Sequence, residues 1–319
     1  MGPSSERCAG PVARLLAGAL ALLLAACDSE SQVAGARSLF EAERMAFVPV
    51  GSTVRTPGDL RSTTIGAVTN DLLVDRFEAS RADWRHWTGA YPDAEGYSVD
   101  AAGTDSARAS WPAFASFDEA RDFAERRGMR LPRVREWVHI AVGSHTEGYP
   151  WGVIKRDSVA NTLELGLHRP TPVGTFENGL SSSGIHDLIG NVAEWAVADG
   201  SPIGEILPQV PEFGSGVALG GSYTRRMRPV TSADGPNSVL GEALGFGVRG
   251  PDLGLRCVVE AERYLLTHAP SWASLPEAEP RLRALGQRWG GGAARLLARL
   301  RGQRPELVAL AWLEAGIER

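Results

Sequence analysis

The stretch GIHDLIGNVAEW at residues 184–195 is the strongest fold signal in this 319-residue sequence. Other short strings accompany it in a fixed order: RLP at 130–132 with Glu136-Trp137 after it, YPWG at 149–152, GGSY at 220–223 and GLR at 254–256. Each string alone is a weak signal, but their order and spacing together are specific. Their glycines permit positive φ or close backbone approach, and their tryptophans can each bury a large apolar area. The strings therefore predict one body with ordered loops and an aromatic core.

The region 45–262 around these strings is rich in Gly, Pro and Trp and has few long periodic runs. This composition favours short strands and many loops, with helices as exceptions. One helix is predicted from Ser116, which stands three residues before Glu119 in a capping-box pattern. A second is predicted from Pro132 onward.

Residues 263–319 differ in composition. Seven arginines and no acidic residue lie between Arg281 and Arg304, among leucines at helical spacing. Glycines 290–292 divide two predicted helices, and Pro305 begins a third. We expect a helical extension packed on the main domain with its arginines in water. The alternative is a basic amphipathic helix at an anionic membrane surface.

The beginning of the chain predicts export and anchoring. Two arginines precede an apolar run, 15–26, that ends at Cys27. The run is shorter than the roughly 20 apolar residues that a membrane-spanning helix needs, and it matches the centre of a cleaved export signal. Its end, LAAC, resembles the bacterial lipobox, whose cysteine receives a diacylglycerol. We predict a signal peptide over 1–26, lipid on Cys27, a tether over 27–44 and an extracytoplasmic place in the cell envelope. An ordinary signal peptide with a chance cysteine is the alternative.

Charge and cysteine content narrow the partners. The net charge of −5 argues against nucleic acid as a general partner. Cys8 would leave with the leader and Cys27 would be acylated, so Cys257 has no disulfide partner within the chain. The membrane, through Cys27, is the first predicted partner.

In their order and spacing, the strings quoted above resemble the sulfatase-modifying factor family, whose best-known member is the formylglycine-generating enzyme. The resemblance covers roughly Met45 to Glu262. It implies an irregular α+β domain related to C-type lectins, with little regular structure and many ordered loops. We therefore expect a sulfatase-modifying factor domain over 45–262.

The resemblance also implies a copper chemistry that this sequence lacks the residues for. The enzymes hold copper with two cysteines shortly after their Gly-Gly-Ser motif, since Cu(I) prefers thiolates. Here residues 223–228 contain no cysteine, and Cys257 is a single thiol after the GLR string. The Trp inside the family's Gly-Asn-Val-Trp-Glu-Trp string is Ala193. Copper is therefore not expected, and formylglycine-type oxidation is not expected either.

Two groups of residues are candidates for ligand binding. By position in the family, the groove would be formed at GGSY and the arginines after it: Ser222, Tyr223, Arg225 and Arg226. Arginines there suit an anionic or carboxylate-bearing ligand. Trp84 and Trp87, with Arg85 and His86 between them, could add aromatic faces. The alternatives are a solvated loop for the arginines, and core plus solvated charge for the tryptophans.

Calcium is the metal that the resemblance implies. The family commonly uses structural calcium, and by position Asn191 and Glu194 would supply oxygens, with Asn161 at the start of a second site. The alternative for Glu194 is a buried carboxylate paired with a base such as Arg256.

Together these features predict a membrane-anchored binding or accessory module that has the family's fold without its copper site. Its ligand would be an exported protein, a peptide or another anionic molecule. The alternative is a cysteine-independent oxidoreductase or modifying enzyme that acts on exported proteins or peptides. A third reading makes the basic C-terminal helices the working part.

Overall fold

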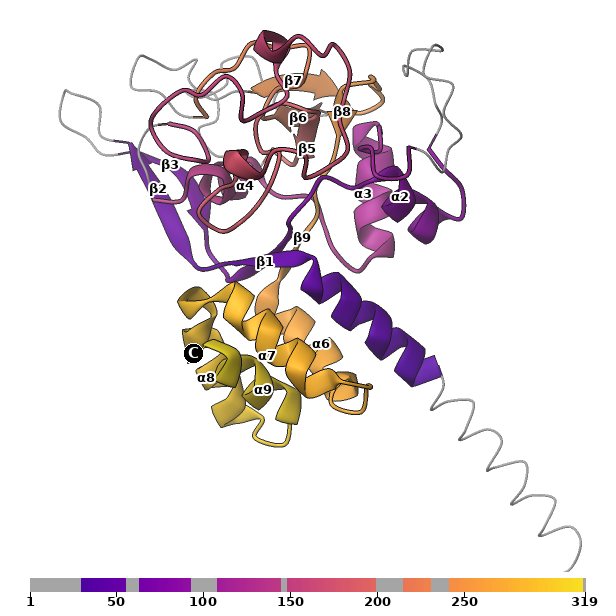
Figure 1. The fold of residues 1–319 in the computed structure, drawn as a ribbon, viewed down its shortest axis with the longest axis vertical. Coiled ribbons are helices and arrows are strands. Elements are labelled where there is room, and N and C mark those ends of the chain that lie inside the picture. The colour runs from indigo at the N-terminus through magenta and orange to yellow at the C-terminus, as the bar shows by residue number, and fades with distance from the viewer. Residues whose placement is uncertain are drawn as a thin grey trace, which may run out of the picture.

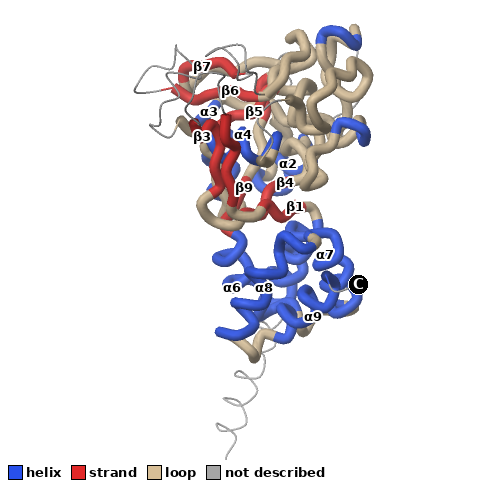
Figure 2. The backbone as a smooth tube through the Cα atoms, turned by 90° about the vertical axis from the view of Figure 1, so that its left-hand side faces the viewer, coloured by secondary structure: helices blue, strands red, loops and turns tan. Residues whose placement is uncertain are grey.

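The structure is a computed structural model that describes residues 30–55, 63–92, 108–144, 148–198, 215–230 and 241–317. Figure 1 shows a mixed part of strands, loops and helices above a bundle of helices. In the side view of Figure 2 the strands lie in the mixed part and the bundle consists of helices with their connections. The predicted α+β class with a C-terminal helical extension is confirmed. Cys27 and the predicted signal peptide lie outside the described residues, among which no helix is long and apolar enough to cross a membrane.

The strands form three small sheets. The first is antiparallel, in the order β1 (Met45–Val48), β4 (Leu72–Asp75) and β9 (Val258–Glu260). The second pairs β2 (Gly51–Arg55) with β3 (Thr63–Val68). The third has the order β7 (Gly241–Gly245), β6 (Ser215–Leu219), β5 (Ala193–Ala196) and β8 (Leu253–Gly254), and only its β5–β8 pair is parallel.

The helices of the mixed part are short: α2 (Arg81–Thr88), α3 (Phe117–Arg126) and α4 (Val134–Val142), with 3-10 turns at Leu163–Leu165 and Glu177–Gly179. The capping box predicted for α3 is present, because the Ser116 hydroxyl accepts from Glu119 N and the Glu119 carboxylate accepts from Ser116 N. Pro132 lies just before α4, as expected. The sequence reasoning missed α2, although Ser80 and Asp83 form the same type of cap.

Most of the segment predicted as a tether, 27–44, is instead a helix packed into the fold. Residues 30–43 form a helix, unlabelled in Figure 1, that lies along the bundle. Leu39 and Ala42 on this helix are 0% exposed. The Tyr264 hydroxyl donates to Ser38 O at 2.7 Å, and Trp272 Nε1 donates to Ser38 Oγ at 2.9 Å. These residues are therefore built into the fold, because their apolar face has a partner more than 200 positions away in the sequence.

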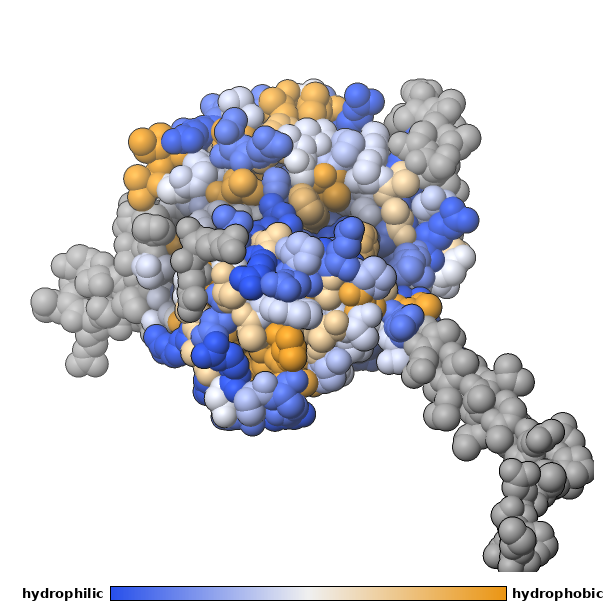
Figure 3. Space-filling view, turned by 60° about the horizontal axis from the view of Figure 1, so that its bottom comes forward, coloured by the Kyte–Doolittle hydropathy of each residue, from blue (hydrophilic) through white to orange (hydrophobic). Residues whose placement is uncertain are grey.

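The bundle contains α6 (Ala261–Trp272), α7 (Ala278–Trp289), α8 (Ala294–Gln303) and α9 (Val308–Ile317), with a 3-10 turn at Gly291–Ala293. The predicted glycine break falls between α7 and α8, where Gly290 has φ 65°. Five of the seven arginines in this segment pair with glutamates: Arg281–Glu43, Arg283–Glu279, Arg299–Glu262, Arg301–Glu314 and Arg304–Glu306. In Figure 3 hydrophilic side chains are interspersed with smaller apolar areas on this end of the molecule. The helices thus pack on the main domain, as in the first of the two readings.

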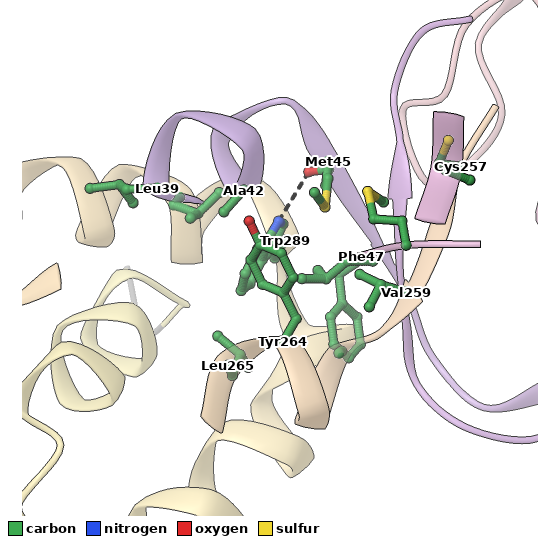
Figure 4. Close-up of a cluster of buried hydrophobic side chains, with 14 of the residues drawn as sticks. Leu39, Ala42, Met45, Phe47, Cys257, Val259, Tyr264, Leu265 and Trp289 are labelled. Atoms are coloured by element: carbon green, nitrogen blue, oxygen red, sulfur yellow. Dashed lines mark hydrogen bonds between the residues drawn. The ribbon is translucent and has the colours of Figure 1, made fainter. Parts of the chain in front are cut away.

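The bundle and the mixed part share one core. Trp289 of α7 donates from Nε1 to Met45 O at 3.1 Å, and its ring lies 6.1 Å from the ring of Phe47 on β1 (Figure 4). A single cluster of buried apolar side chains continues from Trp195 on β5 to Leu313 on α9. Residues 263–317 therefore complete the main domain.

Helices α7 and α9 approach each other closely at Gly286 and Gly316. A Cβ on Gly286 would lie 1.8 Å from Leu313 O, a backbone atom that cannot shift without moving α9. Gly286→Ala should therefore destabilise the protein by about 1–3 kcal/mol through overpacking, measured as the free energy of unfolding in urea. Gly302→Ala on α8 is the matched control: a Cβ there meets nothing within 4 Å, so this change should be neutral or stabilising by about 0.5–1 kcal/mol. Equal effects of the two changes would contradict the close crossing.

Candidate functional site

An ion pair lies at the centre of the motifs. Glu194 on β5 and Arg256 after β8 are 1% and 0% exposed, and Arg256 Nη2 lies 2.5 Å from Glu194 Oε1. Trp137 of α4 donates from Nε1 to the second carboxylate oxygen at 2.8 Å. Burial acts to lower the pKa of Arg256, but the adjacent Glu194 carboxylate outweighs it and raises that pKa. Three of the motifs therefore meet at one buried carboxylate.

The same guanidinium fixes two further segments. Arg256 Nη1 donates to Asp75 O at 2.8 Å, at the end of β4, and Nη2 donates to His186 O at 2.7 Å. Because one acceptor is a backbone atom of β4 and the other lies in the loop before β5, Arg256 joins these two segments to β5. A second arginine of the motifs, Arg130, binds Glu136 at 2.7 Å and Glu260 at 2.8 Å.

A second buried carboxylate holds the turn that precedes β5. Asn191 Nδ2 and Val192 N donate to Glu78 at 2.5 and 3.1 Å. Burial and the nearby Asp187 and Glu194 raise the pKa of Glu78 well above its usual value. Gly190, at φ 80°, leaves room for this turn, since a Cβ there would lie 2.3 Å from Asn161 O.

These contacts do not fit calcium at Asn191 and Glu194. The Asn191 Oδ1 atom accepts from Asn161 Nδ2 at 3.1 Å and from Thr171 N at 2.9 Å, and Glu194 is neutralised by Arg256. Glu194 is instead a buried carboxylate paired with Arg256, as the alternative interpretation of this residue predicted. Within the described ranges no group of three or more His, Cys, Asp or Glu side chains could hold a metal. The Asn161 Oδ1 atom is buried without a hydrogen-bond donor among the described residues, so calcium near Asn161 stays a prediction, which titration of chelator-treated protein tests.

The single thiol offers no ligand surface. Cys257 is 0% exposed in the shared core, where Figure 4 labels it, and burial raises its pKa. A buried, protonated thiol behaves as a small apolar side chain. Cys257 is therefore a core residue.

The predicted groove residues separate into a buried pair and an exposed set. Ser222 is 1% exposed, and its hydroxyl donates to Asp252 Oδ2 at 2.8 Å. Tyr223 is 7% exposed, and burial raises its pKa. These two residues are thus structural, which corrects their assignment to a ligand surface. Arg225, Arg226 and Arg228 are exposed.

The arginines lie on what we name the Arg225 loop, residues 222–230. Arg225 pairs with Glu242 at 2.9 Å, whereas Arg226 and Arg228 form no ion pair within the described part of the chain. The loop is fixed from below, because Met227 N donates to Glu164 at 2.9 Å and Leu163 N donates to Arg225 O at 2.9 Å. Burial acts to raise the pKa of Glu164, but the Met227 N–H and Lys155 hold it at about 2.

An apolar turn that the sequence reasoning did not select adjoins this loop. We name residues 148–156 the Trp151 turn. Val153 and Ile154 at its tip are 71% and 65% exposed, and Trp151 donates from Nε1 to Ile154 O at 3.0 Å. The turn meets the Arg225 loop where Val230 N donates to Gly148 O at 2.9 Å. The YPWG string contained the signal, since two apolar residues and two basic residues follow it directly.

The tryptophan pair is divided between core and surface. Trp84 is 9% exposed and stacks on Phe123 of α3 with ring centroids 5.0 Å apart, so it is a core residue and its assignment to a ligand surface is corrected. Trp87 is half-buried, with the Arg37 guanidinium 5.3 Å from its ring. Because Arg37 belongs to the helix over 30–43, Trp87 lies on a surface different from that of the Arg225 loop.

The fold and the motif contacts define a class: an irregular α+β domain fixed by the Glu194–Arg256 pair. Residues 30–261 match the family model of the sulfatase-modifying factor enzyme 1-like domain. The chain therefore belongs to the sulfatase-modifying factor family, and its resemblance to that family is confirmed.

Individual relatives match shorter stretches. The chain is 32% identical over 112 residues to hercynine oxygenase of Mycobacterium tuberculosis, which covers 34% of this chain and 26% of that one. It is 33% identical over 142 residues to the formylglycine-generating enzyme of the same organism, covering 40% and 46%. It is 28% identical over 142 residues to the inactive C-alpha-formylglycine-generating enzyme 2 of Mus musculus, covering 41% and 46%. The chain thus spans less than half the length of the relatives it matches.

A solved structure has the same fold. Treponema denticola variable protein 1 aligns with a TM-score of 0.50 and 17% identity over 68% of this chain and 94% of that chain. At this identity the likeness concerns the fold alone.

Removing one partner of the central pair tests its role. Arg256→Met leaves Glu194 as a buried charge without its cation, so the free energy of unfolding should fall by about 3–5 kcal/mol. Arg225→Ala is the matched control, because the Arg225–Glu242 pair is 61% and 57% exposed and its loss should cost about 0–1 kcal/mol. If the two variants unfold at the same denaturant concentration, Arg256 does not make the large contribution to stability that its buried contacts predict.

Asp187 provides a pH prediction. Burial raises its pKa to about 6 from 3.8, although the Gly174 N–H bond opposes this. The unfolded chain loses this proton at lower pH than the folded chain, so the carboxyl favours folding below pH 4 and this contribution is lost as pH rises to about 6. Asn has no charge and tolerates the left-handed φ of 57° at this position.

We therefore expect Asp187→Asn to melt close to the wild type at pH 4 and to exceed its stability at pH 7, by on the order of 1–3 kcal/mol. Asp122→Asn, at an exposed carboxylate on α3, should show no such dependence. A difference between wild type and D187N that is independent of pH would exclude the raised pKa.

Proposed function

We propose that the protein is a membrane-anchored extracytoplasmic module that binds exported proteins or peptides carrying acidic groups. The binding surface comprises the Trp151 turn and the Arg225 loop. One observation carries the proposal: an exposed apolar tip adjoins two exposed arginines, which form no ion pair with the described residues, at the place where the family positions its groove. The anchor would be lipid on Cys27.

The chemistry of the surface supports a peptide with mixed character. Val153 and Ile154 supply exposed apolar surface, and its burial against a ligand is favourable. Arg226 and Arg228 supply guanidinium groups, which bind carboxylates bidentately. Glu164 accepts hydrogen bonds from Met227 N of the Arg225 loop and from Lys155 Nζ of the Trp151 turn. Because both elements are fixed in this way, little backbone freedom has to be lost on binding.

The preserved framework beside a changed groove supports binding over oxidation. The motif residues that join the loops are present, from Trp137 to Arg256. The sequence after GGSY has no thiol, and Cys257 lies in the core. A fold does not fix one function, and one relative carries the word inactive in its name.

Charge reversal at the surface tests the binding proposal. Arg226→Glu with Arg228→Glu, and separately Val153→Ser with Ile154→Ser, should each reduce capture of immobilised acidic peptides at least about tenfold, because each removes one class of contact. The change is measured by surface plasmon resonance on an array that varies acidic and apolar residues. Arg295→Glu, exposed on α8, is the control and should bind like the wild type. Unchanged affinity in both double variants would remove this surface from consideration.

A cysteine-independent oxidoreductase or modifying enzyme is the second candidate function. The relatives named hercynine oxygenase and formylglycine-generating enzyme favour it. Oxygen consumption by the purified protein with envelope peptides, with added copper or iron or with no metal, separates the two proposals. Turnover that stops in the Arg226/Arg228 variant would favour the enzyme.

A further inference from the structure

The outer face of the helix over 30–43 is apolar and basic. Val33 and Phe40 are 61% and 51% exposed, and Arg37 between them is also exposed. Their spacing, four and then three residues, places the three side chains on one side of the helix. Leu39 and Ala42 occupy the opposite side, in the core. The helix therefore has two sides that carry apolar residues. The described residues cover the side with Leu39 and Ala42 and leave the side with Val33 and Phe40 exposed.

The end of α2 widens this face. The Trp87 ring lies beneath the Arg37 guanidinium, and His86 meets it edge-on at 5.4 Å. Arg85, on the same helix, is exposed. Two acidic residues nearby are paired with arginines, Asp83 with Arg44 and Glu43 with Arg281. Among the described residues of the helix, Glu30 is the exposed acidic residue, so the face is mainly basic. We name Val33, Arg37, Phe40, His86 and Trp87 the anchor-side face.

The position of the face relative to Cys27 indicates its occupant. Three residue steps separate Cys27 from the first described residue of the helix, a reach of at most roughly 11 Å. Figure 3 shows apolar side chains beside the place where the described chain begins. A lipid on Cys27 would hold the start of this helix at the headgroups, and a tryptophan, a phenylalanine and arginines are the residues that interfacial helices present to anionic lipid.

We propose that the anchor-side face lies on the bilayer, so that the helix over 30–43 runs along an anionic membrane surface. The inference rests on the proposed lipid anchor. It adds the orientation of the body: helix 30–43 lies flat, with Phe40 in the interface as well as Val33. An upright helix would instead carry Phe40 about 15 Å further out, at 1.5 Å per residue from position 30.

Depth measurement on the lipidated full chain tests the orientation. Spin labels on Val33→Cys and Phe40→Cys should both be accessible to oxygen dissolved in lipid and protected from a water-soluble relaxant. Val248→Cys, 42% exposed in the mixed part, is the control for a solvent-facing site. The native Cys257 is 0% exposed, so it will not compete for the label. A Phe40 label that behaves like the Val248 label would overturn the flat orientation.

A second arm separates the face from the anchor. A chain that begins at residue 28 keeps all residues that the structure describes and lacks Cys27, the proposed acylation site. Its binding to vesicles of phosphatidylcholine with 30% phosphatidylserine is measured by sedimentation. Val33→Ser with Phe40→Ser should weaken binding by about tenfold or more, whereas the matched Val153→Ser with Ile154→Ser pair should leave it unchanged. Salt should weaken binding to these vesicles, and vesicles without phosphatidylserine should bind poorly.

The outcomes remain distinguishable. Mass spectrometry that finds no lipid on Cys27 would end the anchor proposal, while vesicle binding by the chain from residue 28 would still support the face. If the Val33/Phe40 variant instead abolishes self-association seen by ultracentrifugation, the face is a contact between copies, and the membrane assignment is overturned.

Discussion

The buried Glu194–Arg256 pair is the constraint on which the rest of the structure depends. A charged pair with almost no solvent exposure is stable only when its remaining donors and acceptors are used. Here Trp137, Asp75 O and His186 O use them. A change in any of these segments therefore affects the others, and this explains why widely separated sequence strings occur together. The pair specifies how the loops meet, and hydrophobic burial around it supplies the stability.

This arrangement separates framework from function. The framework contacts use backbone atoms and buried side chains, while the Arg225 loop and the Trp151 turn project from it. Exposed residues on these projections, such as Arg226 and Ile154, can change without disturbing the Glu194–Arg256 pair beneath them. In our proposal, the same framework thus carries a peptide-binding surface in this protein.

The sequence predicted what depends on local patterns and on the order of motifs. The Ser116 cap, the glycine break after α7 and the α+β class all follow from short stretches. The partnership of Glu194 with Arg256 could be stated only as an alternative, because spacing along the chain does not reveal which charge approaches which. Trp84 and Trp87 are three residues apart on one helix, yet one faces α3 and the other faces Arg37. That difference depends on packing between distant segments, which propensity does not encode. The helix over 30–43 was missed for the same reason, since its polar beginning resembles a linker and its partner lies beyond residue 260.

The closure of the N-terminal helix onto the bundle has a consequence for the order of folding. Ser38 accepts hydrogen bonds from Tyr264 and Trp272, and Met45 O accepts one from Trp289, so residues 38–45 are completed by segments that follow more than 200 positions later. Contacts of such long sequence separation form slowly. The helix over 30–43 would therefore remain without its apolar partners until the residues up to Trp289 had been made. A premature stop near the carboxyl end would thus leave the amino-terminal segment unfinished, and degradation of shortened chains should begin there.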